Sequence, residues 1–468
     1  MTSLSISPRV LLLPVFFLLP HPIRAYTSFQ PTCSVPNETV HFVASAGVRG
    51  TFDILWSCLF TILACTWSIQ HLNIPEQRDR RKETSKRWGA TTWYDTVWAM
   101  KRFWTNFKWM VVTILAPEMI LGKAIGDLMT AGKLTRKLRK RAEDEGVEWS
   151  VTHSFFLLMG GFRFEKTTKG SETEPRIDVD KSPSEIVVLT PGRLKYIVAK
   201  YENWISLGPR VLPRLHKISG EEIKDKSKSN LFVKIVAVIQ VVWVTVQVIV
   251  RTSRGLPVSQ LELVVTAFSA CAVLTYIVLI PKPQGVEVPA PSIPVFESQW
   301  HTVQGQWNSG TIHLRSFFIP GLDESEDREY TGAVANDAIC IDEYRDASWH
   351  AFGISASGIL FGVIHIAGWN FDFPSHTDRM IWRVSSVLIV ALLPPSLLPF
   401  FWNCYSQTFN LYRISLRRER FAQMFALICG FIYTLARLAL LAETFRSLAY
   451  MPPPAYISTW TENVPHFG

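Results

Sequence analysis

Long apolar runs separated by polar stretches dominate the pattern of this chain. A run of about 20 apolar residues is long enough to cross the hydrocarbon core of a bilayer as a helix. Runs of that kind occur at residues 51–70, 231–250, 259–280, 349–369, 380–403 and 421–441. The pattern therefore predicts an all-α protein, a polytopic transmembrane helix bundle with about six spans.

Two shorter apolar pieces, residues 107–122 and 149–162, lie between the first two runs. Basic residues lie on both sides of the first piece, so a crossing would break the charge asymmetry expected across a membrane. We predict that both pieces are interfacial or re-entrant helices. Tryptophans suited to headgroup depth precede or lie within the first piece, at positions 93, 98, 104 and 109.

The N-terminus has the pattern of a targeting segment. A short apolar run interrupted by prolines follows Arg9 and ends before a small residue, Ala25. Such a pattern is typical of a signal peptide, and residues 1–25 are predicted to be a signal peptide or an N-terminal anchor. The glycosylation motif Asn37-Glu38-Thr39 follows, and it is expected to be modified if the segment 26–50 is lumenal.

Basic clusters set the orientation of the spans. The connection after the first run contains the dense cluster RDRRKETSKR, which predicts a cytoplasmic location. Alternate threading then places the arginine-rich segment 404–420 on the same side and the short loop 370–379 in the lumen. The chain divides into a first membrane region (51–280) with a cytoplasmic loop (163–228), a cytoplasmic loop (281–348), a second membrane region (349–441) and a lumenal tail (442–468).

Composition supports the membrane interpretation and narrows the chemistry. Of 468 residues, 48% are hydrophobic, and the net charge of +9 is concentrated in clusters, which favours an anionic membrane surface over nucleic acid as partner. Seven cysteines, most of them in or beside apolar runs, indicate no disulfide framework. Zinc-type spacings and the HExxH, GxSxG and P-loop motifs do not occur, so we expect no metal and no cofactor.

Ionisable residues inside apolar runs are the candidates for chemistry, because a charge in hydrocarbon is costly. Arg437 has no acidic residue one helical turn away, so its partner must come from another helix or from backbone carbonyls, unless it snorkels to the interface. Glu262 has no basic residue within one turn. Either Arg251 and Arg254 fold back on Glu262, or it serves as an acid.

Three further polar positions lie on the second run. Gln240, Gln247 and Arg251 share one face of the predicted helix, with Trp243 beside them. That face should point into the bundle. Its glutamines either bind neighbouring helices or line a ligand site.

The remaining candidates each have an ordinary alternative. His365 is a proton donor or a hydrogen-bonded helix contact. Glu118, which follows Pro117 on the cytoplasmic side, is a buried acid or merely part of a proline break. Asp53 binds a ligand, or it pairs with Arg49 and the dipole at the helix start.

Several strings, taken in order, resemble an uncharacterised family of fungal multi-pass membrane proteins. The strings are RGTFDILWSCLFTILACTW, APEMI, WSVTHSFFLLMGGF, LPVSQLEL and ARLALLAETFRSL. The resemblance covers about residues 49–468 and implies no known activity. The chain departs from the family pattern at Ile280-Pro-Lys-Pro283, where an aromatic pair usually precedes Lys-Pro. Fungal membrane-bound terpene cyclases are similar only in architecture.

These observations predict an integral membrane protein of the endoplasmic reticulum or plasma membrane. The leading hypothesis is an enzyme that acts by acid catalysis on a lipophilic, isoprenoid-like substrate. Its expected partners are the lipid bilayer and that small molecule, and the oligomeric state stays open. The alternatives are a transporter, channel or receptor-like protein, and a scaffold. The predicted catalytic residues are Glu262, Glu118 and His365, and the predicted substrate-binding residues are Arg437, Gln240, Gln247 and Asp53.

Overall fold

The structure of the protein is a computed structural model. It describes residues 35–43, 48–77, 90–144, 146, 148–167, 186–191, 194, 218–227, 231–296, 300, 311–313, 333–340, 344–398 and 416–459. The predicted signal peptide or anchor, residues 1–25, lies outside the described residues, as does most of the arginine-rich segment 404–420.

Six long helices correspond to the six predicted apolar runs. They are α1 (Thr51–Ser68), α9 (Leu231–Ser253), α10 (Gln260–Val278), α12 (Tyr344–Ile366), α13 (His376–Ser396) and α15 (Leu416–Leu448). All of these except α13 are long and apolar enough to cross a membrane. The predicted all-α, membrane-spanning bundle is therefore confirmed.

Helix α13 begins earlier than its apolar run. The hydroxyl of Ser375 accepts a hydrogen bond from the backbone N–H of Asp378, which caps the helix at this end. The first turns consequently include the charged residues Asp378, Arg379 and Arg383, which lower the hydropathy of α13. Its remaining length packs between α12 and α15.

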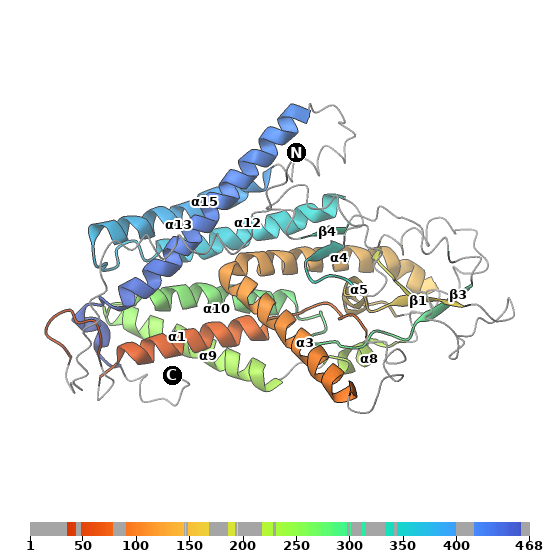
Figure 1. The fold of residues 1–468 in the computed structure, drawn as a ribbon, viewed down its shortest axis with the longest axis horizontal. Coiled ribbons are helices and arrows are strands. Elements are labelled where there is room, and N and C mark those ends of the chain that lie inside the picture. The colour runs from red at the N-terminus through yellow and green to blue at the C-terminus, as the bar shows by residue number, and fades with distance from the viewer. Residues whose placement is uncertain are drawn as a thin grey trace.

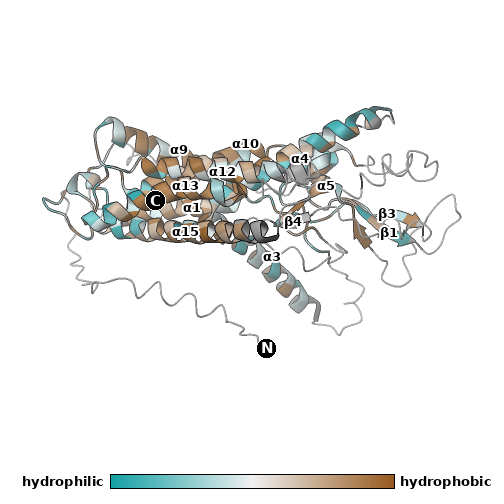
Figure 2. Cartoon of the chain, turned by 90° about the horizontal axis from the view of Figure 1, so that it is seen from above, coloured by the Kyte–Doolittle hydropathy of each residue, from teal (hydrophilic) through white to brown (hydrophobic). Residues whose placement is uncertain are grey.

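The six helices run alternately between two ends of the molecule (Figure 1). One end, called here the sheet end, has the β-strands. The other, called the loop end, consists of residues 48–50, 254–259, 367–375 and 449–459. Figure 2 shows hydrophobic residues along the bundle and hydrophilic residues toward its two ends, as expected for a membrane protein.

Helices α3 (Ala90–Leu115) and α4 (Pro117–Asp144) form a broken pair. Their axes bend by 106° at Ala116. Only when the two helices are taken together are they long and apolar enough to count as one candidate span. Proline explains the break, because Pro117 has no N–H to continue the hydrogen-bond ladder of α3 and suits the first position of α4. Both helices lead from the bend toward the sheet end (Figure 1). The bent pair forms either a broken span or a re-entrant segment, and the second of these is what the sequence predicts for residues 107–122.

The second short apolar piece behaves differently from the prediction. It forms α5 (Val151–Leu158), and its side chains are buried among protein side chains rather than at an interface. Phe156, Leu157 and Phe162 belong to a second hydrophobic core at the sheet end, together with Leu134 and Leu138 of α4. The run is apolar because it is enclosed by protein on all sides.

Short strands complete the sheet end. Strand β1 (Arg163–Thr167) pairs antiparallel with β2 (Ile186–Val188) and parallel with β3 (Ile293–Phe296). Strands β4 (Thr311–His313) and β5 (Ala338–Cys340) form a separate antiparallel pair. The short helix α8 (Gly220–Asp225) packs beside α5. The predicted loops 163–228 and 281–348 therefore contribute to a folded subdomain.

Glycines bring α4 and α12 into close contact. A side chain at Gly122 would overlap the backbone of Ile354, and one at Gly126 would overlap the ring of His350. Gly353 of α12 in turn faces the carbonyl of Gly122. The spacing Gly122-x-x-x-Gly126 is the pattern that lets membrane helices approach each other closely.

Candidate functional site

The break between α3 and α4 creates the first feature of the site, a backbone carbonyl left without its helical partner. Met119 would be the donor to Leu115 in an unbroken helix, but its N–H bonds instead to the carbonyl of Ala116. The carbonyl oxygen of Leu115 accepts from Arg437 of α15, at 3.3 Å from Nε and 3.0 Å from Nη2. Arg437 therefore finds a backbone partner, as its sequence context predicted.

Glu118 lies in the first turn of α4, beside that carbonyl. Its residue surface is 1% exposed. The hydroxyl of Tyr433 donates a hydrogen bond to Oε1 of Glu118, and Oε2 lies 3.9 Å from Nη2 of Arg437. Oε2 is buried and has no hydrogen-bond partner among the described residues. Tyr433 and Arg437 are four positions apart on α15, so one face of that helix presents both to Glu118.

Phe361 of α12 links this group to His365. The guanidinium carbon of Arg437 lies 4.0 Å from the centre of the Phe361 ring. The ring of His365 lies 4.4 Å from the same ring, centre to centre, and its Nδ1 is 2.7 Å from the Phe361 carbonyl oxygen. Trp382 of α13 donates its indole N–H to the carbonyl of His365 at 3.1 Å. We call Glu118, Tyr433, Arg437, Phe361 and His365 the Glu118 centre.

The structure thus brings together three predicted site residues from three separate helices, namely Glu118, Arg437 and His365. Their sequence positions gave no sign of this, because Glu118 was expected on the cytoplasmic side and Arg437 lies near the end of the last apolar run, which leads to the predicted lumenal tail. The two lie at one depth because the α3–α4 pair reaches far into the bundle. At 1.5 Å per residue, α15 rises about 16 Å from Arg437 to its end at Leu448. That rise is about half of a hydrocarbon core roughly 30 Å thick.

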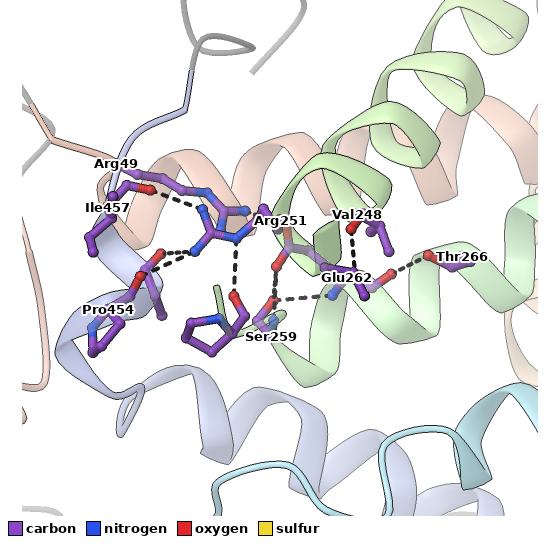
Figure 3. A network of polar contacts seen from close by, with 11 residues as sticks. Arg49, Val248, Arg251, Ser259, Glu262, Thr266, Pro454 and Ile457 are labelled. Carbon is purple, nitrogen blue, oxygen red and sulfur yellow. Dashed lines mark hydrogen bonds and ion pairs between the residues drawn. The ribbon is translucent and has the colours of Figure 1, made fainter. Parts of the chain in front are cut away.

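Glu262 belongs to a different network, at the loop end (Figure 3). Its Oε1 lies 2.5 Å from Nη2 of Arg49, and its Oε2 accepts from the backbone N–H and the hydroxyl of Ser259 at 2.8 and 2.9 Å. Ser259 in turn accepts from the N–H of Glu262, which closes a capping box at the start of α10. Both carboxylate oxygens are therefore occupied by structural partners.

The partner expected for Glu262 is used elsewhere. Arg251 donates to the backbone carbonyls of Pro257 at 3.0 Å, Ala455 at 2.8 Å and Ile457 at 3.0 Å (Figure 3). It therefore holds the C-terminal segment against the α9–α10 turn instead of closing an ion pair with Glu262. The expectation that Arg251 or Arg254 folds back onto the carboxylate is corrected, since Arg49 takes that place.

The other predicted substrate-binding residues, Gln240, Gln247 and Asp53, lie on α9 and α1. Gln240 and Gln247 are buried, which confirms that their face of α9 points into the bundle. Oε1 of Gln240 lies 3.4 Å from the hydroxyl of Thr61 on α1, and Thr61 donates. Asp53 caps α1, because its Oδ2 accepts from the N–H of Gly50 at 2.9 Å. These contacts join α9 to α1 and fix the start of α1, and they do not involve Glu118.

A buried ionic cluster lies nearer the sheet end. Oδ2 of Asp127 is 2.7 Å from Nζ of Lys123 and 3.4 Å from Nζ of Lys282, and Oδ1 is 3.2 Å from Nε2 of His350. Lys123 and Asp127 are four positions apart, so they share one face of α4. The cluster ties α4 to α12 and to the segment after α10, on the same side of α4 as the close glycine contact.

Sequence reasoning missed two members of the Glu118 centre. Tyr433 could have been predicted, because it lies one helical turn before Arg437 and therefore on the same face of α15. Phe361 carried no signal, since an aromatic residue in an apolar run is ordinarily a packing residue. Among the residues that the structure describes, no group of three or more His, Cys, Asp or Glu side chains is placed to hold a metal ion.

Comparison with known proteins supplies a family but no activity. The model of one protein family, described as a family of unknown function (DUF8562), matches residues 13–298. No curated protein and no solved structure matches the chain.

Proposed function

The chain belongs to this family of unknown function, and we propose from its geometry that it is a membrane-embedded enzyme acting by acid catalysis on a lipophilic substrate. One observation carries the proposal. Oε2 of Glu118 is a buried carboxylate oxygen with no hydrogen-bond partner among the described residues, beside an arginine and a tyrosine. A buried polar atom left unpaired costs about 1–3 kcal/mol, and such costs concentrate at functional sites.

Each member of the Glu118 centre has a chemical role in this proposal. Glu118 exchanges a proton with the substrate through Oε2, while the hydroxyl of Tyr433 holds Oε1 in place. Arg437, fixed by the carbonyl of Leu115, orients a polar group of the substrate. The rings of Phe361 and His365 face the same region, and aromatic faces stabilise positive charge that develops after protonation.

An isoprenoid-like substrate fits this arrangement. Protonation of an alkene creates a carbocation, and an apolar layer lined by aromatic rings shields such a cation from water. The architectural similarity to fungal membrane-bound terpene cyclases points the same way and carries no weight alone. Glu262 has no catalytic role in the proposal, because Arg49 and Ser259 occupy both of its oxygens.

The proposal is tested by comparing untargeted lipid and terpenoid profiles of cells that express the wild type or Glu118→Gln. Glu118→Gln removes the exchangeable proton with little change in shape, so the product of the wild type should fall by about 10²–10⁴-fold. Glu443→Gln is the matched control, because Glu443 is also a buried carboxyl on an apolar helix and accepts from Ser447. Equal lipid and terpenoid profiles for the wild type and Glu118→Gln, at equal amounts of folded protein, would overturn the proposal that the protein is an enzyme.

The second candidate is a transporter, channel or receptor-like protein that uses the same centre. It is favoured by the break between α3 and α4, because transporters place their binding sites where membrane helices are interrupted. A pH-sensitive dye in reconstituted vesicles would report proton-coupled flux. Flux that disappears in Arg437→Gln, without any change in lipid profile, would support transport over catalysis.

For the location, we propose that the sheet end faces the cytoplasm and the loop end faces the lumen or the exterior. The exposed basic residues at the sheet end support this orientation, among them Arg136, Arg139 and Lys140 of α4. The endoplasmic reticulum and the plasma membrane both fit it. Residues 1–25 would then act as a signal peptide or anchor that delivers residues 26–50 to the loop end.

A further inference from the structure

Arg163 at the sheet end has an unusual environment for an arginine. It is the first residue of β1, outside the candidate spans, and its surface is 5% exposed. Two of its nitrogens, Nε and Nη2, are buried and have no hydrogen-bond partner among the residues that the structure describes. Arginine is almost never enclosed in this way unless it is paired.

The two unpartnered nitrogens lie on the same edge of the guanidinium. The geometry of Arg437 illustrates this, because there the corresponding Nε and Nη2 both reach one oxygen atom, the carbonyl oxygen of Leu115. The N–H groups along this edge are nearly parallel. They match two oxygens of a single oxyanion, which is the bidentate geometry for which arginine is preferred over lysine.

Among the described residues, no hydrogen-bond partner neutralises the Nε–Nη2 edge of Arg163. Glu165, two residues along the same strand and on the same face, accepts a hydrogen bond from the hydroxyl of Ser292 at 2.5 Å. Opposite Arg163 across the antiparallel pair is Val188, which is fully buried in an apolar cluster. Burial lowers the pKa of the Arg163 guanidinium. Arginine nevertheless stays charged in proteins, so the charge persists in an environment that disfavours it.

We propose that the Nε–Nη2 edge of Arg163 binds a phosphate group. Phosphate presents paired oxygens and carries more charge than a carboxylate, so it fits both the shape and the charge of this edge. The group belongs either to a free phosphate-bearing solute or to a lipid headgroup. This site is on a different element from the Glu118 centre and does not depend on the proposed enzyme activity.

The test is thermal unfolding of the purified full-length protein in a neutral detergent. The probes are inorganic phosphate, acetate and chloride at matched ionic strength, and a short-chain phosphatidic acid. Phosphate that binds only the folded state should raise the unfolding temperature of the wild type by several degrees at saturation. Arg163→Gln should lose this shift, and Arg163→Lys should retain part of it because the charge remains without the paired edge.

Arg136→Gln is the matched control, because it removes an exposed cation from the same end and should keep the full response. A larger shift with phosphatidic acid than with inorganic phosphate would identify a lipid headgroup, and the reverse would identify a solute. The proposal is overturned if neither phosphate source exceeds chloride, if acetate acts as strongly as phosphate, or if the shift persists in Arg163→Gln. If Arg163→Gln fails to fold, Arg163→Lys still decides the question, because a full phosphate shift in that variant would also overturn the proposal.

Discussion

At the scale of single residues, the ion pair between Arg49 and Glu262 is expected to dominate stability at the loop end. Both side chains are at least 95% enclosed, with exposures of 4% and 1%. Arg49→Gln or Glu262→Gln leaves one charge buried without its partner, which costs about 3–5 kcal/mol. Chemical unfolding in detergent should show this loss in each single variant, and a smaller loss in the double variant than the sum of the two.

An exposed pair provides the comparison. Lys101 and Glu76 lie 3.4 Å apart and are both more than half exposed. Solvent screens such pairs, so Glu76→Gln should change stability by less than about 1 kcal/mol. Additive effects of Arg49→Gln and Glu262→Gln would contradict the prediction, because additivity means that the two side chains do not interact.

Residue-level prediction succeeded where the chemistry of one side chain was sufficient. The isolated charge of Arg437 required a partner from a backbone carbonyl or another helix, and Leu115 provides it. The partner of Glu262 was out of reach, because Arg49 precedes it by 213 positions and no local spacing connects them. The meeting of Glu118 with Tyr433 was equally hidden, since it depends on how deeply the α3–α4 pair enters the bundle.

At the scale of elements, the contact between α4 and α12 should tolerate no added side chain. A methyl group at Gly126 would overlap the ring of His350, and its accommodation requires the helices to separate. Gly126→Ala should therefore destabilise the protein by about 1–3 kcal/mol, measured as a lower unfolding temperature. Separating α4 from α12 would also disturb the hydrogen bond between Asp127 and His350.

Gly132, on the same helix, is the matched control. Nothing lies within 4 Å of the position its side chain would take. Alanine also favours helix over glycine by about 1 kcal/mol, so Gly132→Ala should be neutral or stabilising. Equal losses in Gly126→Ala and Gly132→Ala would show that helix backbone effects, and not the close contact, govern both positions.

The long apolar helices could be predicted from the sequence, whereas the elements at the sheet end, which are buried by protein, could not. Apolar runs located the six long helices, with ends of α12, α13 and α15 displaced by up to seven residues, and Pro117 located the break. Strands β1 and β3 gave no such signal, because they have four or five residues each and pair across a long separation, as Phe164 does with Ile293. Helix α5 misled for the opposite reason, since burial by protein and burial by lipid select the same side chains.

At the scale of the whole molecule, the orientation proposed above predicts a glycan on Asn37. The residue and Thr39 are exposed, in a segment without regular secondary structure. That segment is fixed at the loop end, because Val43 accepts from the N–H of Thr51 at 3.0 Å and His41 contacts the carbonyl oxygen of Ala449 at 3.0 Å. Every described basic residue of the α4 cluster is at the opposite end.

Expression in a eukaryotic host, followed by enzymatic removal of N-linked sugars, should therefore change the electrophoretic mobility of the wild type. Asn37→Gln and Thr39→Ala should abolish that change, whereas Thr39→Ser should keep it because serine also completes the motif. A glycan appears only if the loop end enters the lumen, so the same band shift reports the direction of all the spans. A wild type whose mobility is unaffected, although Asn37 is exposed, would place the loop end in the cytoplasm.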